Sequence, residues 1–206
     1  MTSSCPARCV GCHNEHQDEN HLGNIPKFIN LDSVKEMMTR LYNMNRLPNE
    51  VVISGGEPSL FNELGELAKF LRNIGVPYIS LNSNCLGWSN VLDSFDWINE
   101  IKVHIEDVPH KDNMNAYSDT IGLSNSVLEN IKKIPSLLKQ GQASYINTIM
   151  RSQQQVKRII DFSIEHGFNT KLIEESLVTT NKVSYSKEEC IDYLLSNQYI
   201  SHTNNH

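Results

Sequence analysis

Short apolar runs alternate along this chain with longer segments in which apolar residues recur every three or four positions. The short runs are rich in β-branched residues and end at polar or glycine residues, which is typical of buried strands. These predicted strands are residues 50–53, 78–81, 101–105, 144–149 and 170–173. The longer segments have helical periodicity. These predicted helices are residues 31–41, 64–71, 88–95, 127–138, 156–166 and 186–195.

Local signals mark several ends of the predicted helices. Asp32 is a plausible N-cap of the first helix, and Pro135 should end or kink the fourth helix. Gly167 is a natural C-cap for the fifth helix, and Ser186 begins a capping box for the last one. The polar segment 107–123 is predicted to be a loop.

Strand followed by helix, repeated, predicts an α/β fold with a parallel sheet or partial (β/α) barrel covered by helices. No internal linker or repeat interrupts the pattern, so one domain is expected over residues 1–206. Ligands of such folds gather at the carboxyl ends of the strands. The residues just after each strand are therefore the candidates for function.

Composition narrows the class of protein. The 206 residues carry a formal net charge of -6, with no basic stripe, which argues against a nucleic-acid partner. No signal peptide and no apolar stretch long enough to span a bilayer is visible, so a cytoplasmic protein without membrane contact is expected. Three of the five cysteines lie within eight residues, unlike the cysteines of a secreted disulfide framework.

Cys5, Cys9 and Cys12 form a CxxxCxxC motif that His13 follows directly. Thiolates and an imidazole so close together could hold zinc, hold an iron–sulfur cluster or form disulfides. A zinc tetrahedron is awkward to close with His13 adjacent to Cys12.

The first clear strand ends in the turn Ser54-Gly55-Gly56-Glu57-Pro58. Two consecutive glycines allow positive φ angles and a close approach of backbone to a ligand. By itself this turn could equally be a tight connection between a strand and a helix. A zinc site at the cysteines would not explain why the GGEP sequence is present.

The cysteine motif followed by a strand ending in GGEP resembles the radical S-adenosylmethionine (SAM) enzymes. This resemblance implies a partial (β/α) barrel. It also implies that Cys5, Cys9 and Cys12 ligate three irons of a [4Fe-4S] cluster and that SAM chelates the fourth iron. Gly55, Gly56, Glu57 and Pro58 would lie beside the methionine moiety of SAM. The electron would come from an external reductant such as flavodoxin or ferredoxin.

Two branches of the family are similar to different parts of the chain. The segment CPARCVGCHN resembles the activating enzymes of anaerobic ribonucleotide reductase, with Gly11 where many branches have an aromatic residue that lies against the adenine. The body, over about residues 5–175, resembles the GTP cyclase of molybdenum-cofactor synthesis. The second resemblance implies cosubstrate or substrate contacts at the strand ends, namely at Ser83, Asn84, His104, Asn147 and Glu174.

The chain also departs from these relatives. Cys85 and Cys190 are too far apart for the second cluster of the cyclase, and a lysine expected near Tyr145 is absent. Only four residues precede Cys5, so the first strand of the barrel is expected to be truncated. Residues 176–206 are expected to form a C-terminal helix and a flexible tail.

The resemblance implies an enzyme that abstracts a hydrogen atom from a small biosynthetic substrate such as a nucleoside, sugar or amino acid. An activating protein for a glycyl-radical enzyme, which would have a protein partner, is a second hypothesis. A zinc-stapled interaction module and a non-catalytic family member are further alternatives. Cys85, Tyr117 and Tyr145 are candidate hydrogen-atom donors, and Cys85 is preferred as the catalytic residue because it follows a strand end.

Overall fold

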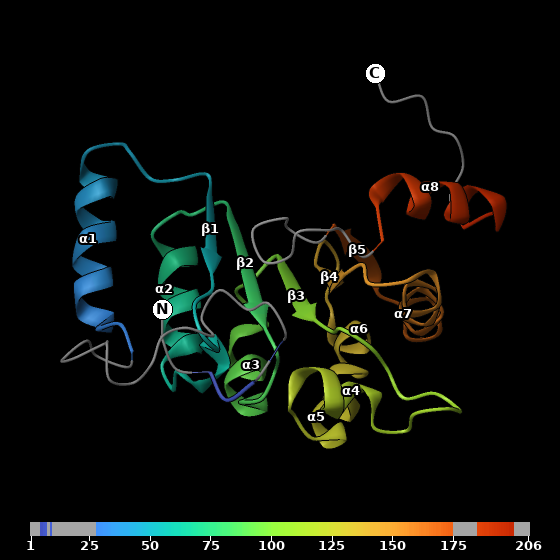
Figure 1. The fold of residues 1–206 in the computed structure, drawn as a ribbon. Helices are drawn as coiled ribbons and strands as arrows, with labels where there is room; N and C mark the ends of the chain where they lie inside the picture. Colours follow the sequence, from blue (N-terminus) through green and yellow to red (C-terminus); the bar gives the residue numbers. More distant parts are fainter. Residues whose placement is uncertain (1–4, 8, 10–27, 175–184, 200–206) are drawn as a thin grey trace, which may run out of the picture.

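A computed structural model describes residues 5–7, 9, 28–174 and 185–199. Its described part contains a five-stranded sheet in which neighbouring strands are parallel and follow sequence order (Figure 1). The strands are β1 (Glu50–Ile53), β2 (Tyr78–Ser83), β3 (Glu100–His104), β4 (Ala143–Ile149) and β5 (Asn169–Ile173). All five coincide with the predicted strands, and the α/β prediction is confirmed. Because the strands are parallel and consecutive, their carboxyl ends meet at one edge of the sheet.

Helices connect successive strands, and one more helix lies before β1 and another after β5. They are α1 (Leu31–Asn43), η1 (Pro58–Leu60), α2 (Leu64–Asn73), α3 (Trp88–Ser94), α4 (Ala116–Ile121), α5 (Asn125–Ile131), α6 (Ile134–Leu137), α7 (Gln153–His166) and α8 (Lys187–Ser196). The contacts between α2 and β2, between α6 and β4, and between α7 and both β4 and β5 place the helical layer against the sheet (Figure 1). Helix α1 packs against α2.

The two faces of the sheet differ in polarity. On β3, Ile101 and Val103 are fully buried, whereas Lys102 and His104, which alternate with them, are half-buried. Side chains of a strand alternate between faces, so the apolar row packs under the helices and the polar row lies on the opposite, inner face. The sheet therefore presents polar groups to the side where a (β/α) barrel encloses its ligands.

The predicted helix at 127–138 is interrupted just before Pro135, as expected from that proline, and forms α5 and α6. Two other local predictions were wrong. The segment predicted as a loop contains helix α4, whose residues Ala116, Tyr117 and Ile121 are buried. The N-cap of α1 is Asn30, whose side chain accepts a hydrogen bond from Ser33, and not Asp32.

The C-cap at Gly167, with φ 82°, and the capping box between Ser186 and Glu189 are confirmed. Within the part of the chain that the structure describes, no helix is long and apolar enough to cross a membrane. The predicted tail beyond residue 199 lies outside the described residues.

Candidate active site

The turn after β1 is shaped by glycine and by a buried carboxylate. Gly55 has a φ of 146°, a backbone conformation that residues other than glycine rarely adopt. Glu57 follows in extended conformation and caps η1, where its Oε1 accepts a hydrogen bond of 2.8 Å from the backbone N–H of Ser59. The side chain of Glu57 thus turns inward, and the residue is only 2% exposed.

The carboxylate of Glu57 joins the ends of two neighbouring strands. Its Oε1 also accepts a hydrogen bond of 2.5 Å from the hydroxyl of Ser83, at the end of β2. Its Oε2 accepts one of 2.7 Å from the backbone N–H of Asn84. Three donors therefore satisfy this buried charge, as a carboxylate removed from water requires.

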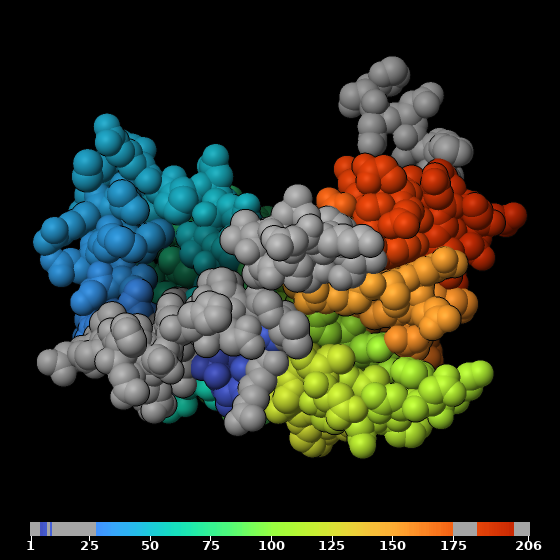
Figure 2. All heavy atoms as spheres, in the orientation of Figure 1, coloured from blue at the N-terminus to red at the C-terminus, as the bar shows by residue number. Residues whose placement is uncertain are grey.

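Asn84 links this junction to the cysteine segment. Its Oδ1 accepts a hydrogen bond of 3.0 Å from the backbone N–H of Leu86, and its Nδ2 lies 3.8 Å from Sγ of Cys5 as a donor. Two features of the sequence that are 79 residues apart are thereby brought together. The described residues 5–7 and 9, dark blue in Figure 2, lie between the blue α1 side of the molecule and the yellow-green region of α4 and α5.

Two of the three predicted cluster ligands lie within the described residues. Cys5 and Cys9 are both half-buried, and Cys9 packs against the main hydrophobic core. Cys12 and Gly11 lie outside the described residues. The described part alone contains no group of three His, Cys, Asp or Glu side chains that could hold a metal ion. The roles predicted for the three cysteines and for Gly11 therefore stay predictions.

Tyr117 and Cys85 are fully buried beside this junction. Burial raises the pKa of the Tyr117 hydroxyl, and electrostatic interactions with Cys85, Cys9 and Glu57 act in the same direction. Among the described residues the hydroxyl of Tyr117 has no hydrogen-bond partner. The Cys85 thiol is 0% exposed, and burial raises its pKa too, so the neutral thiol predominates. Cys85 is thus not open to solvent as an exposed catalytic thiol would be.

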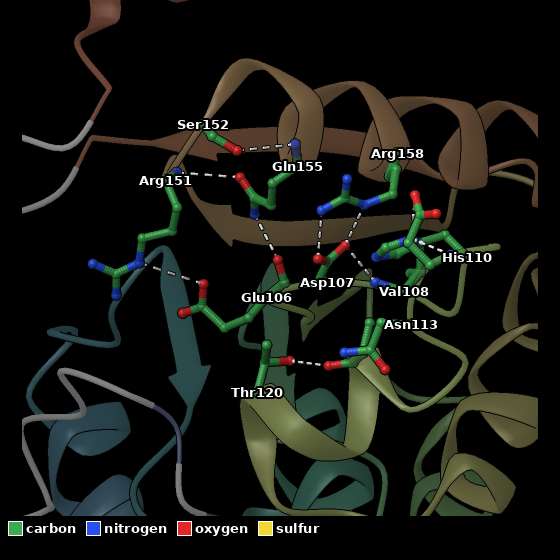
Figure 3. A network of polar contacts seen from close by, with 12 residues as sticks. Glu106, Asp107, Val108, His110, Asn113, Thr120, Arg151, Ser152, Gln155 and Arg158 are labelled. Carbon is green, nitrogen blue, oxygen red and sulfur yellow. Dashed lines mark hydrogen bonds and ion pairs between the residues drawn. The ribbon is translucent and has the colours of Figure 1, made fainter.

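A second polar group occupies the inner face at the ends of β3 and β4. Nε2 of His104 lies 3.0 Å from Oε1 of Glu106, which is 5% exposed on its side chain. Nε of Arg151 lies 4.0 Å from Oε2 of the same carboxylate, as Figure 3 shows. Asn147 pairs in register with His104, and its Oδ1 is buried without a hydrogen-bond partner among the described residues. Glu106 and Arg151 were not predicted; each lies two residues after the end of a strand, which is the signal that could have identified them.

Gln155 of α7 forms hydrogen bonds with the residues at the ends of β3 and β4, and its bond to Glu106 is drawn in Figure 3. Its Nε2 donates to the backbone oxygen of Glu106 at 2.6 Å and to Oγ1 of Thr148 at 2.9 Å. Next to it, the guanidinium of Arg158 forms two hydrogen bonds with the carboxylate of Asp107, at 2.9 and 2.6 Å. The loop after β3 is therefore tied to α7 at Glu106 and at Asp107.

Glu174 lies apart from both groups. It is exposed, and its Oε1 accepts a hydrogen bond of 2.9 Å from the backbone N–H of Lys187, at the start of α8. The structure thus brings Gly55, Glu57, Ser83, Asn84 and Cys5 together, places His104 and Asn147 side by side on neighbouring strands, and directs the Glu174 carboxylate toward α8.

Comparisons with known proteins find relatives of this chain. A probable GTP 3',8-cyclase of Sulfurisphaera tokodaii is 24% identical over 198 residues, which are 93% of this chain and 59% of that protein. A Methanocaldococcus jannaschii protein that carries the name of a glycyl-radical enzyme activating enzyme is 33% identical over 87 residues, covering 41% of this chain and 32% of that protein. This chain therefore spans less than two thirds of the length of either relative.

Solved structures share the fold. Streptococcus suis SuiB bound to S-adenosylmethionine matches 96% of this chain, and 47% of its own chain, with a TM-score of 0.69 at 15% identity. The family model of the radical SAM superfamily matches residues 1–173, a range that includes the cysteine motif, the GGEP turn and all five strands. By its motifs, its sheet and this match, the chain belongs to the radical SAM superfamily.

Proposed function

We propose that this chain binds a [4Fe-4S] cluster through Cys5, Cys9 and Cys12 and uses S-adenosylmethionine in a radical reaction on a small biosynthetic substrate. The observation that carries the proposal is the contact between the two family motifs. The GGEP carboxylate holds Asn84, and Asn84 in turn reaches Cys5. When bound, such a cluster would supply the single electron that cleaves the sulfonium of S-adenosylmethionine, drawn from a flavodoxin or ferredoxin.

The donor set fits a cluster of this kind. Thiolates are the protein ligands that iron–sulfur clusters use, and Cys5 and Cys9 lie beside the end of the GGEP junction. Gly55 and Gly56 carry no side chain, so a charged amino-acid moiety could approach the backbone closely there. Glu57 would act by position, because its carboxylate already has three donors from the protein.

The substrate would lie on the polar inner face of the sheet. His104, Asn147 and Tyr145 are half-buried there. Among the described residues the amide oxygen of Asn147 has no hydrogen-bond partner, and a hydroxyl or amino group of the substrate could supply one. These groups suit a small polar molecule such as a nucleoside, sugar or amino acid. The cyclase relatives make GTP the first compound to test.

The test is anaerobic reconstitution with iron and sulfide, followed by reduction in the presence of S-adenosylmethionine, with and without GTP. We expect a brown protein with about four irons per chain and formation of 5′-deoxyadenosine. Cys9→Ala should lose the cluster, whereas Cys190→Ala, which changes a cysteine buried in another part of the molecule, should keep it. A colourless chain that retains zinc would overturn the proposal in favour of a zinc-stapled module.

A second candidate function is activation of a glycyl-radical enzyme, which the Methanocaldococcus jannaschii relative favours. It would have a large protein partner in place of a small substrate. An activating enzyme would generate a glycyl radical, visible by electron paramagnetic resonance, when mixed with such a partner. Deoxyadenosine formed with GTP, and no radical on the partner, would favour the first proposal.

A further inference from the structure

We propose that the side-chain amide of Asn84 tunes the cluster by donating a hydrogen bond to the sulfur of Cys5, so that the reduced state is favoured. Asn84 would be a positioning residue, acting on the cluster through one ligand. This inference rests on the proposed function, because it assigns a role to Asn84 only where Cys5 holds iron.

The orientation of the amide is determined by its other contacts. The backbone N–H of Leu86 donates to Oδ1 of Asn84 at 3.0 Å. A flipped amide would place its NH₂ group against that N–H, with two donors facing each other. Nδ2 therefore faces Sγ of Cys5, at 3.8 Å, in the range of hydrogen bonds to the large sulfur atom.

The backbone of Asn84 is held equally firmly. Its N–H donates to Glu57 at 2.7 Å, and the residue is only 8% exposed. The next residue, Cys85, donates its own N–H to the Ser83 hydroxyl at 2.9 Å, and that hydroxyl donates to Glu57. The turn at the end of β2 thus directs one N–H of the Asn84 amide at the sulfur, and hydrogen bonds hold both the backbone and the side-chain oxygen of this residue.

A donor at this position changes a redox equilibrium. Reduction adds an electron whose charge is shared by the ligand sulfurs, so an N–H beside a sulfur stabilises the reduced state more than the oxidised state. The hydrogen bond is present in both oxidation states, and the part by which it is stronger in the reduced state is expected to change the equilibrium constant for reduction roughly tenfold. Asn84 would therefore make the cluster easier to reduce by the external donor.

The experiment compares the midpoint potentials of reconstituted wild-type, Asn84→Ala and Asn84→Asp chains by redox titration followed with electron paramagnetic resonance. Asn84→Asp keeps an oxygen for the Leu86 N–H but has no donor for Cys5. We expect the equilibrium constant for reduction to fall roughly tenfold in Asn84→Ala, about 59 mV for one electron, and further in Asn84→Asp. Asn90→Ala is the matched control, because Asn90 donates to the Ser59 carbonyl oxygen in the same region and has no sulfur contact among the described residues.

A second measurement uses the chain without a cluster. The unfolding free energies of wild type, Asn84→Ala, Cys5→Ala and the double variant form a cycle that isolates the contact between the two side chains. We expect the two substitutions to be non-additive. Additive changes in unfolding free energy, together with equal midpoint potentials in all variants, would overturn this inference but leave the proposed function standing. A wild-type chain that takes up no cluster would overturn the proposed function and this inference with it.

Discussion

Cys85 combines an unusual backbone conformation with a fully buried thiol. Its φ of 62° lies in the left-handed region, where residues other than glycine are uncommon and some strain is stored. Its N–H is bound by the Ser83 hydroxyl, which holds the conformation in place. Burial, followed by the negative charge of Glu57, raises the pKa of the thiol above its ordinary value of 9.0. The thiol is therefore kept neutral in the folded chain.

The burial of the Cys85 thiol predicts that the free energy of unfolding falls at alkaline pH. Above pH 9 the Cys85 thiol ionises in the unfolded chain but stays protonated in the folded chain, so the unfolded state binds fewer protons and the free energy of unfolding falls as pH rises. One such group contributes a slope of up to about 1.4 kcal/mol per pH unit. Cys85→Ala should show a shallower decline between pH 9 and 11 in urea unfolding than wild type. Parallel curves for the two chains would contradict the prediction.

For Glu57, the family resemblance implies a place beside the cosubstrate, which stays a prediction, and the sequence could not show what its carboxylate contacts. In the structure the carboxylate accepts hydrogen bonds from Ser59, Ser83 and Asn84. Two of these donors lie 26 and 27 residues further along the chain, so their approach depends on the pairing of β1 with β2. The Asn84–Cys5 contact depends in the same way on where the fold returns the cysteine segment.

At the scale of elements, the start of α3 lies against η1 so closely that only glycine fits. A Cβ on Gly87 would lie 1.9 Å from the backbone oxygen of Ser59. The N–H of Gly87 donates to the Ser59 hydroxyl at 2.9 Å, and Asn90 donates to the Ser59 carbonyl oxygen at 2.8 Å. Position 87 therefore ties the residues after GGEP to the residues after β2.

Gly87→Ala should destabilise the chain by about 3 kcal/mol, because a backbone oxygen cannot give way as the end of a flexible side chain can. Gly141→Ala is the matched control. A Cβ on Gly141 would have no atom within 4 Å, but this glycine has a φ of +86°, so the cost of the substitution should be conformational strain alone, about 1 kcal/mol. Urea unfolding measures both. Equal losses of unfolding free energy in the two variants would show that η1 can move away from a Cβ at position 87 at little cost.

The strands were predictable from sequence because each is a short apolar run bounded by polar residues, and burial between helices and sheet demands such runs. Helix α4 was missed for the opposite reason. Its buried residues Ala116, Tyr117 and Ile121 lie among Asn, Asp, Ser and Thr residues that favour turns locally. Packing against the main core, which contains Tyr117 and Ile121, overrides that local preference.

At the scale of the whole molecule, the described residues form two hydrophobic clusters. The larger one spans β1 to β4 and most helices, and the smaller one joins α7 and α8 at the β5 edge. The smaller cluster is built from Met150, Val156, Ile160, Tyr185, Cys190 and Leu194. Tyr199 adds a polar contact at this end, where its hydroxyl donates to Asp161 at 3.1 Å.

Few buried groups hold α8, so it should open before the rest of the molecule unfolds. Leu194→Ala removes a side chain that is 8% exposed in the smaller cluster and should lower the free energy of this local opening by about 2 kcal/mol. We expect hydrogen exchange of the α8 amides to accelerate by roughly 30-fold while the β2 and β3 amides keep their wild-type rates. Ile191→Ala is the matched control on the same helix, because Ile191 is 38% exposed and should change exchange little. Equal acceleration in α8 and in β2 would instead mean that both clusters unfold as one cooperative unit, and the junction at Glu57 would then depend on the distant end of the sheet for its stability.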